Sequence, residues 1–181
     1  FKIKKGVFFH DDKAFPEGKG RELEAKDFVY SIKRLADPKL QSLGWWLLDG
    51  KIAGLNEWRK KYTDKKEADY SEKIEGLQAI DKYTVRFKLS KSFPQFLYAL
   101  AMPFTFVVPE EVVKHYNKEF LNHPIGTGPF ILPQFNQTKK IVYKRNPKFR
   151  KKLFPSEVSE EFKGKGIEQY AGKTLPIIDK I

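Results

Sequence analysis

The clearest hydrophobic pattern along the chain predicts a helix over residues 25–35. Phe28, Ile32 and Leu35 recur at helical spacing and form one apolar stripe, which Val29 widens. The charged residues of the segment fall on the opposite, polar face: Lys26, Asp27, Lys33 and Arg34. Weaker helical patterns predict further helices over residues 51–62, 92–100 and 109–115.

Alternation of apolar and polar residues predicts β-hairpins. Residues 84–89 alternate strictly, and they follow residues 77–80 and a turn at 81–83, which is typical of a hairpin. The remaining strand patterns are shorter: a second hairpin of 130–132 and 141–143 joined through 136–138, and single strands at 1–4 and 104–108.

Hairpins mixed with helices that do not alternate regularly with them predict an α+β fold with a mixed, mainly antiparallel sheet. Residues 1–150 carry nearly all of these elements, whereas residues 151–181 are irregular and include a Gly-Lys-Gly stretch at 164–166. We therefore expect one structured unit followed by an irregular tail. Both ends of the chain look cut, which suggests a piece of a longer protein.

Composition narrows the class of protein. The 181 residues are 40% hydrophobic and include 16 Phe, 8 Tyr and 3 Trp, enough to bury a core. A net charge of +12 leaves a nucleic-acid-binding domain open as an alternative. However, the lysines are spread along the chain and no known docking element accompanies them, so we expect no nucleic-acid partner. There is no cysteine and no apolar run of the roughly 20 residues that cross a membrane.

The sequence offers little catalytic chemistry. His10, His115 and His123 have no metal-ligand spacing, and no serine lies in a nucleophile elbow. The glycines at 126 and 128 lack the spacing and the lysine of a phosphate-binding loop. We therefore predict no catalytic residue, no metal and no cofactor, which favours a binding protein over an enzyme.

An aromatic pair is the most distinctive candidate for ligand contact. Trp45 and Trp46 follow Gly44 in a short segment between two predicted helices. Core packing explains at least one such indole, but an exposed indole also supplies a large contact area at low entropic cost. Both interpretations stay open from the residues alone.

Four stretches, taken in order, resemble the extracellular solute-binding proteins, family 5, that serve oligopeptide, dipeptide and nickel ABC importers. They are FKIKKGVFFHDD at 1–12, EAKDFVYSIKR at 24–34, AIDKYTVRF at 79–87 and HPIGTGPF at 123–130. RNPKF at 145–149 follows as it usually does in this family. Asp12 replaces the usual glycine, the loop at 16–23 is longer than typical, and 157–173 looks like an insertion.

The resemblance implies a fold, a function and partners. Residues 1–150 would be the outer subdomain and adjoining strands of the first lobe of a periplasmic-binding-protein type II-like protein, and 151–181 a tail returning toward the main sheet. The parent would be exported by an upstream signal to the periplasm or cell envelope. There it would capture oligopeptides for an ABC permease, using a second lobe absent here. Other solutes, such as a dipeptide, a nickel chelate or haem, remain alternatives.

The resemblance also implies roles for residues of this chain. The segment 43–48 corresponds to an aromatic-bearing stretch that approaches the peptide, so we expect Gly44, Trp45 and Trp46 to contact the ligand. The segment 123–130 is instead expected to be a rigid turn. There Gly126 and Gly128 would take positive φ or permit close backbone approach.

Overall fold

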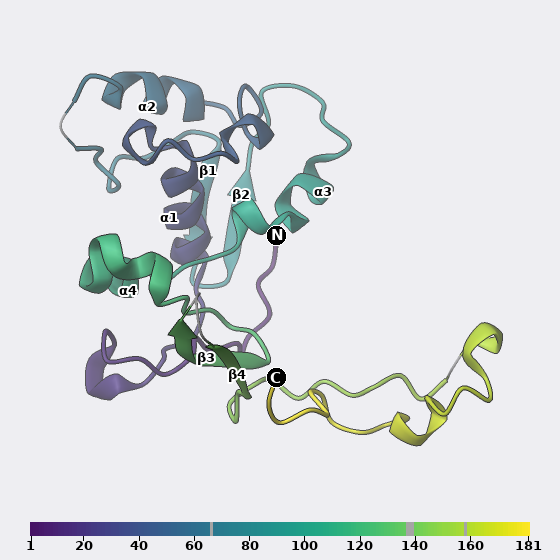
Figure 1. The fold of residues 1–181 in the computed structure, drawn as a ribbon. Helices are drawn as coiled ribbons and strands as arrows, with labels where there is room; N and C mark the ends of the chain where they lie inside the picture. Colours follow the sequence, from purple (N-terminus) through teal and green to yellow (C-terminus); the bar gives the residue numbers. More distant parts are fainter. Residues whose placement is uncertain (66, 137–139, 158) are drawn as a thin grey trace.

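The computed structural model describes residues 1–65, 67–136, 140–157 and 159–181 (Figure 1). Its helices and strands are α1 Ala25–Ala36, α2 Leu55–Tyr62, β1 Leu77–Asp81, β2 Thr84–Phe87, α3 Phe96–Ala101, α4 Glu110–Tyr116, β3 Phe130–Asn136 and β4 Lys140–Arg145. Short 3₁₀-helices connect several of them, among them η3 Trp45–Leu47, η4 Pro103–Thr105 and η5 Asn117–Asn122.

Helix α1 confirms the helix predicted over residues 25–35 and lies at the centre of the molecule (Figure 1). The Asp27 carboxylate accepts the Glu24 N–H at 2.8 Å and so caps the first turn. Two residues of the expected polar face, Asp27 and Lys33, are buried instead. Lys33 Nζ donates to the carbonyls of Tyr70 and Glu72 at 2.7 and 2.6 Å, so its charge is satisfied by a connection that folds back over the helix.

Both predicted hairpins form, and each is extended by a third segment. Strands β1 and β2 pair antiparallel, and residues 1–3 run along β2, where the Ile3 N–H donates to the Tyr83 carbonyl. Strands β3 and β4 also pair antiparallel, and residues 179–181 run along β4. The expected connection of this second hairpin lies partly at 137–139, outside the described residues. The α+β fold with antiparallel pairing is confirmed.

The strand predicted at residues 104–108 is wrong. Pro103–Thr105 forms η4, and the Thr105 hydroxyl bonds back to the Leu100 and Met102 carbonyls at 2.9 Å. Farther along, the Val108 N–H donates to Ser31 Oγ of α1 at 2.9 Å. The polar groups of the segment therefore bond within the segment and to α1, and they do not pair with a neighbouring strand.

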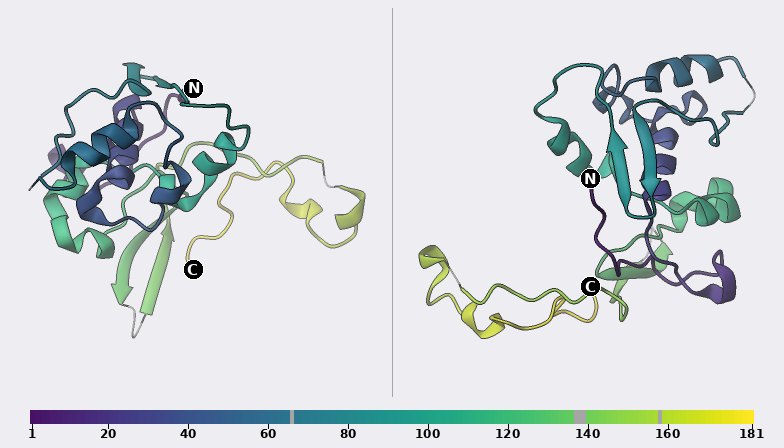
Figure 2. Two further views of the ribbon diagram at one scale, coloured as in Figure 1. Left: turned by 90° about the horizontal axis from the view of Figure 1, so that it is seen from above. Right: turned by 180° about the vertical axis from the view of Figure 1, so that it is seen from behind.

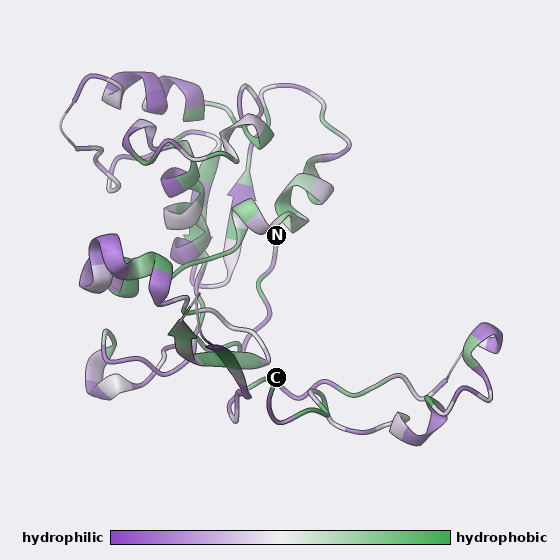
Figure 3. Ribbon diagram, in the orientation of Figure 1, coloured by the Kyte–Doolittle hydropathy of each residue, from purple (hydrophilic) through white to green (hydrophobic). Residues whose placement is uncertain are grey.

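The hydrophobic interior consists of two clusters. The larger one lies between α1, α2 and β1 and is built from residues such as Leu48, Ile52, Leu55 and Trp58. The smaller one surrounds Phe9: Val7, Phe15, Leu23 and Val112. Colouring by hydropathy shows the apolar residues concentrated along β1 and α3, while α2 presents a polar outer face (Figure 3). The larger cluster packs α1, α2, β1 and α3 together, and the smaller cluster packs the N-terminal segment against α4.

Residues 151–157 and 159–178 form a long arm that projects away from the rest of the molecule (Figure 1 and Figure 2). A bridge between Leu153 and Thr174 and the backbone hydrogen bonds beside it tie its two sides together. Short 3₁₀-helices at Glu160–Phe162 and Glu168–Tyr170 shape its end. The irregular tail expected for 151–181 is therefore an ordered excursion that returns to β4.

Candidate ligand-binding surface

The segment with the aromatic pair is held at the surface by the residues that follow it. Trp45–Leu47 is one turn of 3₁₀-helix, closed by Leu47 N–H to the Gly44 carbonyl at 3.1 Å and Leu48 N–H to the Trp45 carbonyl at 2.9 Å. Leu47 and Leu48 are buried in the larger cluster. Their burial fixes the orientation of the two indoles that precede them.

The structure separates the two tryptophans. The Trp45 ring packs at the edge of the larger cluster, and the Arg59 guanidinium lies 4.8 Å from its centroid, a cation–π contact. Trp46 is 62% exposed, and the neighbouring Leu43 is 86% exposed. Trp45 therefore has a packing role, whereas Trp46 is presented to solvent. A ligand contact by either residue remains a prediction.

Gly44 allows a close contact between two distant segments. Its φ of −90° suits any residue, but a Cβ placed there would lie 2.5 Å from Cβ and Cγ of Phe104. Only a glycine therefore lets Phe104 pack directly against the backbone of this segment. Phe104 is a surface residue that the sequence did not indicate as a contact residue, because the apolar run at 104–108 suggested a short strand.

Phe104 also lines a groove that we call the apolar groove. It has a volume of about 540 Å³ and lies between the end of α1, η4 and η5. Its exposed apolar lining comprises Leu40, Phe104, Phe106 and Leu121. Exposed apolar residues gathered in this way mark an interaction surface more often than scattered ones do. No spacing in the sequence could have shown it, because its residues come from four separate segments.

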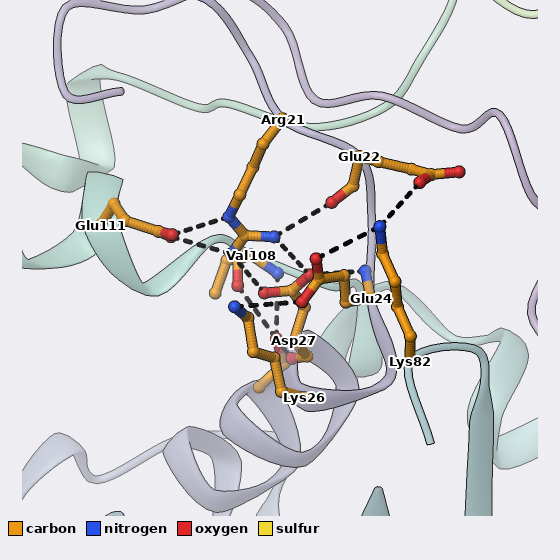
Figure 4. Close-up of polar contacts among 9 residues, drawn as sticks. Arg21, Glu22, Glu24, Lys26, Asp27, Lys82, Val108 and Glu111 are labelled. Atoms are coloured by element: carbon orange, nitrogen blue, oxygen red, sulfur yellow. Dashed lines mark hydrogen bonds and ion pairs between the residues drawn. The ribbon is translucent and has the colours of Figure 1, made fainter. Parts of the chain in front are cut away.

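A partly buried ion cluster lies at the N-terminal end of α1 (Figure 4). Arg21 forms a two-point pair with Asp27, at 2.6 and 2.8 Å, and a second one with Glu111, at 2.6 and 2.9 Å. Burial opposes ionisation of Glu111, but its bonds to Arg21 outweigh this and leave its pKa below the usual value. The guanidinium of Arg21 and the carboxylates of Asp27 and Glu111 are all bonded to one another. The cluster therefore has a structural role, in which it joins the loop before α1 to α4.

The expected turn at 123–130 is held through its carbonyl groups. The His10 N–H donates to the Gly126 carbonyl at 2.8 Å, and His10 Nε2 and Asn146 Nδ2 lie 3.0 and 3.1 Å from the Gly128 carbonyl. The expectation for the two glycines was wrong: neither has a positive φ, and a Cβ on either would meet nothing within 4 Å. The stretch at 1–12, through His10, thus bonds to the stretch at 123–130, through Gly126 and Gly128.

His10 is buried, and its protonation state follows from its partners. Because the Gly128 carbonyl is an acceptor, Nε2 carries the proton, which leaves Nδ1 bare and without a partner among the described residues. Burial lowers the pKa of His10, although the Gly128 bond and nearby Asp11 oppose the effect. Asp11 in turn pairs with Lys148 at 2.7 Å.

We expect acidification to destabilise the chain through His10. Its pKa is depressed on folding, so the unfolded chain takes up the proton first as the pH falls below about 6.5. The free energy of unfolding should then drop by at most about 1.4 kcal/mol per pH unit. Urea unfolding at pH 7.5 and 5.5 measures this drop. His10→Gln keeps a donor for Gly128 but cannot titrate, so the drop should shrink; an unchanged drop contradicts the assignment.

Neither a metal centre nor a membrane segment is found in the described residues. No group of three or more histidine, aspartate or glutamate side chains there is placed to hold a metal ion. None of the helices in the same ranges combines the length and apolar character needed to cross a bilayer. The surface features considered as candidates for ligand contact are the apolar groove and the Trp46 segment.

Comparison with known proteins identifies the family. The family described as "Bacterial extracellular solute-binding proteins, family 5 Middle" matches residues 1–181. Di/tripeptide-binding protein 2 of Pseudomonas aeruginosa is 29% identical over 156 residues, which cover 83% of this chain and 27% of that protein. The dipeptide-binding protein of Escherichia coli is 32% identical over 149 residues, 80% of this chain and 25% of that protein.

A solved structure shares the fold. The substrate-binding domain of an oligopeptide ABC transporter from Bacillus anthracis aligns with a TM-score of 0.66 and 24% identity, covering 82% of this chain and 26% of that one. The present chain thus spans about a quarter of the length of the relatives it matches. From the match over its full length, the chain belongs to the bacterial extracellular solute-binding proteins, family 5.

Proposed function

We propose that this chain is part of the first lobe of a binding protein that captures oligopeptides for an ABC importer in the cell envelope. The observation that carries the proposal is the exposed Trp46, two residues after Gly44, whose backbone packs against Phe104 of the apolar groove. Relatives named as di/tripeptide- and dipeptide-binding proteins support a peptide ligand. Membership of a family of solute-binding proteins favours binding over chemistry.

In this proposal, residues 1–150 form the outer subdomain and adjoining strands of the first lobe, and 151–181 are a tail that returns to the main sheet. The pairing of residues 179–181 with β4 supports that return. A second lobe, supplied by the remainder of the parent, would close over the peptide by a hinge motion. Backbone hydrogen bonds would provide affinity, and exposed aromatic side chains would contact ligand side chains.

Two alternatives concern the ligand. Another solute, such as a dipeptide, a nickel chelate or haem, would use the same closure, and competition between these ligands and peptides separates them. Nucleic-acid binding by the +12 surface is not favoured by the family. A steep salt dependence of specific DNA affinity would be its signature.

Trp46→Ala in the full-length parent should weaken peptide binding at least fivefold, because an exposed indole at a contact surface contributes more than about 1 kcal/mol. Isothermal titration with a mixture of tri- and tetrapeptides measures the affinity. The free energy of unfolding should stay within about 0.5 kcal/mol of the wild type, since the side chain is mostly exposed.

The matched control is Tyr98→Ala, which removes an exposed aromatic side chain from α3, outside the apolar groove. Its peptide affinity should equal that of the wild type. Equal affinities for the wild type and Trp46→Ala would remove Trp46 from the binding surface. Absence of peptide binding by the wild-type parent would refute the proposed function itself.

A further inference from the structure

The edge of β2 that faces residues 1–3 is only partly paired. The Phe1 nitrogen donates to the Val85 carbonyl at 2.7 Å, and the Val85 N–H donates to the Phe1 carbonyl at 3.0 Å. Alternate residues of a strand point their backbone groups to the same side, so the N–H and carbonyl of Phe87 also point away from β1 and toward this edge. Neither group of Phe87 has a hydrogen-bond partner among the described residues.

An apolar hollow of about 530 Å³ lies beside this edge. Its lining includes Val85 and Phe87 of β2 and Leu97 of α3. Phe1, which also lines it, contacts the Phe87 ring edge-to-face at 5.5 Å and is 54% exposed, while Leu97 is 63% exposed. A strand edge with free backbone groups next to exposed apolar side chains is a surface suited to pairing with another strand.

We propose that the chain of a longer parent directly before Phe1 continues as a strand along β2 and closes this hollow. Residues 1–3 run antiparallel to β2 with Phe1 opposite Val85, so each earlier position lies one residue further along β2. The second position before Phe1 would thus lie opposite Phe87 and exchange two backbone hydrogen bonds with it. The present chain spans about a quarter of the length of its relatives, so a parent of their length has further chain to provide this strand.

The pleat of β2 sets the chemistry of the added strand. Val85 and Phe87 line the hollow, whereas Arg86 between them is exposed. The side chain at the second position before Phe1 would share the face of Phe87, so we expect a large apolar residue that fills the hollow. The position directly before Phe1 would share the face of Arg86, so we expect a polar residue there. A shift by one residue would exchange the two faces, and the pairing of Phe1 with Val85 prevents it.

A strand of the same chain is favoured over a separate partner for two reasons. It continues, without a turn, the pairing that residues 1–3 already make with β2. A tethered strand is also present at a much higher effective concentration than a free one. A peptide ligand is the main competitor for the edge, because peptides also bind by strand addition. Only the strand of the parent, however, holds one fixed register against β2.

Disulfide cross-linking in the full-length parent tests this register, since these 181 residues contain no cysteine. Cysteine is placed directly before Phe1 and combined with Arg86→Cys. These positions flank a hydrogen-bonded pair, so their Cα atoms should lie about 4.5 Å apart, within the range that a disulfide spans. Under mild oxidation the bridge should form within threefold of the rate for Lys2→Cys with Thr84→Cys, a pair that the structure already places opposite each other.

The control replaces Arg86→Cys by Gln78→Cys. Gln78 faces Arg86 from β1, so it lies two strand spacings, about 10 Å, from the added strand and should not bridge. Failure of the Arg86→Cys pair while the reference pair bridges overturns the inference, as does a bridge that peptide ligands slow at least tenfold. The inference goes beyond the proposed function: bridging in a parent that binds no peptide supports the added strand and refutes only peptide capture.

Cysteine labelling measures whether the hollow is closed. In the parent, Leu97→Cys should react with a maleimide at least tenfold more slowly than Tyr98→Cys, because Leu97 lines the hollow and the exposed Tyr98 does not. Glycine at the second position before Phe1 removes the side chain expected to fill the hollow and should raise the Leu97→Cys rate at least threefold. Equal rates at the two positions, or no rise with glycine, would show that this strand does not close the hollow.

Discussion

Arg21→Met should lower the free energy of unfolding by about 3–5 kcal/mol, the typical loss when one partner of a buried ion pair is removed. The guanidinium holds two carboxylates, and that of Asp27 is almost completely buried. Without Arg21, Asp27 and Glu111 lose the two-point hydrogen bonds and the charge of the guanidinium, and Asp27 keeps only its bond from the Glu24 N–H. The loop before α1 also loses one of its connections to α4 (Figure 4), while the Tyr116 hydroxyl bond to Asp12 remains.

Urea unfolding followed by tryptophan fluorescence measures this loss. Arg21→Lys should fall between wild type and Arg21→Met, because an ammonium restores the charge but not the fork that reaches both carboxylates. Lys19→Met is the control, since the Lys19–Glu17 pair is exposed on both sides and should contribute less than about 1 kcal/mol. A similar small effect for Arg21→Met would show that the cluster contributes nothing to stability beyond an ordinary surface pair.

Gly20→Ala should destabilise the fold by about 3 kcal/mol or more. An alanine Cβ would lie 2.1 Å from the Phe9 carbonyl oxygen and 2.5 Å from that of His10, so the backbone itself must move. That movement would disrupt the Phe9 N–H bond to the Arg21 carbonyl and displace Phe9, which is fully buried.

Gly126→Ala is the matched control for Gly20→Ala. Its added methyl group meets no atom within 4 Å and its φ is not positive, so stability should change by less than about 0.5 kcal/mol. Thermal unfolding of both variants gives the comparison. A loss at Gly126 as large as that at Gly20 would contradict the steric explanation.

Local patterns were sufficient to predict the helix at 25–35 and both hairpins, because period and turn residues act within a few positions. They failed wherever a distant group decided the outcome. Lys33 can be buried because its ammonium group donates hydrogen bonds to the Tyr70 and Glu72 carbonyls, nearly 40 positions away in the sequence. Residues 104–108 are not a strand because Ser31 takes the Val108 N–H.

The candidate site was predictable only in part. The aromatic pair was conspicuous, and its composition suggested contact with a ligand. Which indole is exposed depends on the burial of Leu47 and Leu48 after it, and the sequence left this open. The apolar groove depends on Gly44 meeting Phe104 and on Arg34 and Lys118 lining the same hollow, contacts between segments that no local pattern encodes.

The arm is a suitable place to attach a fluorophore or to insert a small domain. The arm is held together by its own bonds, Gly172 N–H to the Phe154 carbonyl between its two sides and Gln169 to the Gly166 carbonyl near its end. In the described ranges it adds nothing to either hydrophobic cluster. A fluorophore or small domain inserted near Gly164 would therefore sit outside the folded body. It would leave the two hydrophobic clusters and the apolar groove untouched.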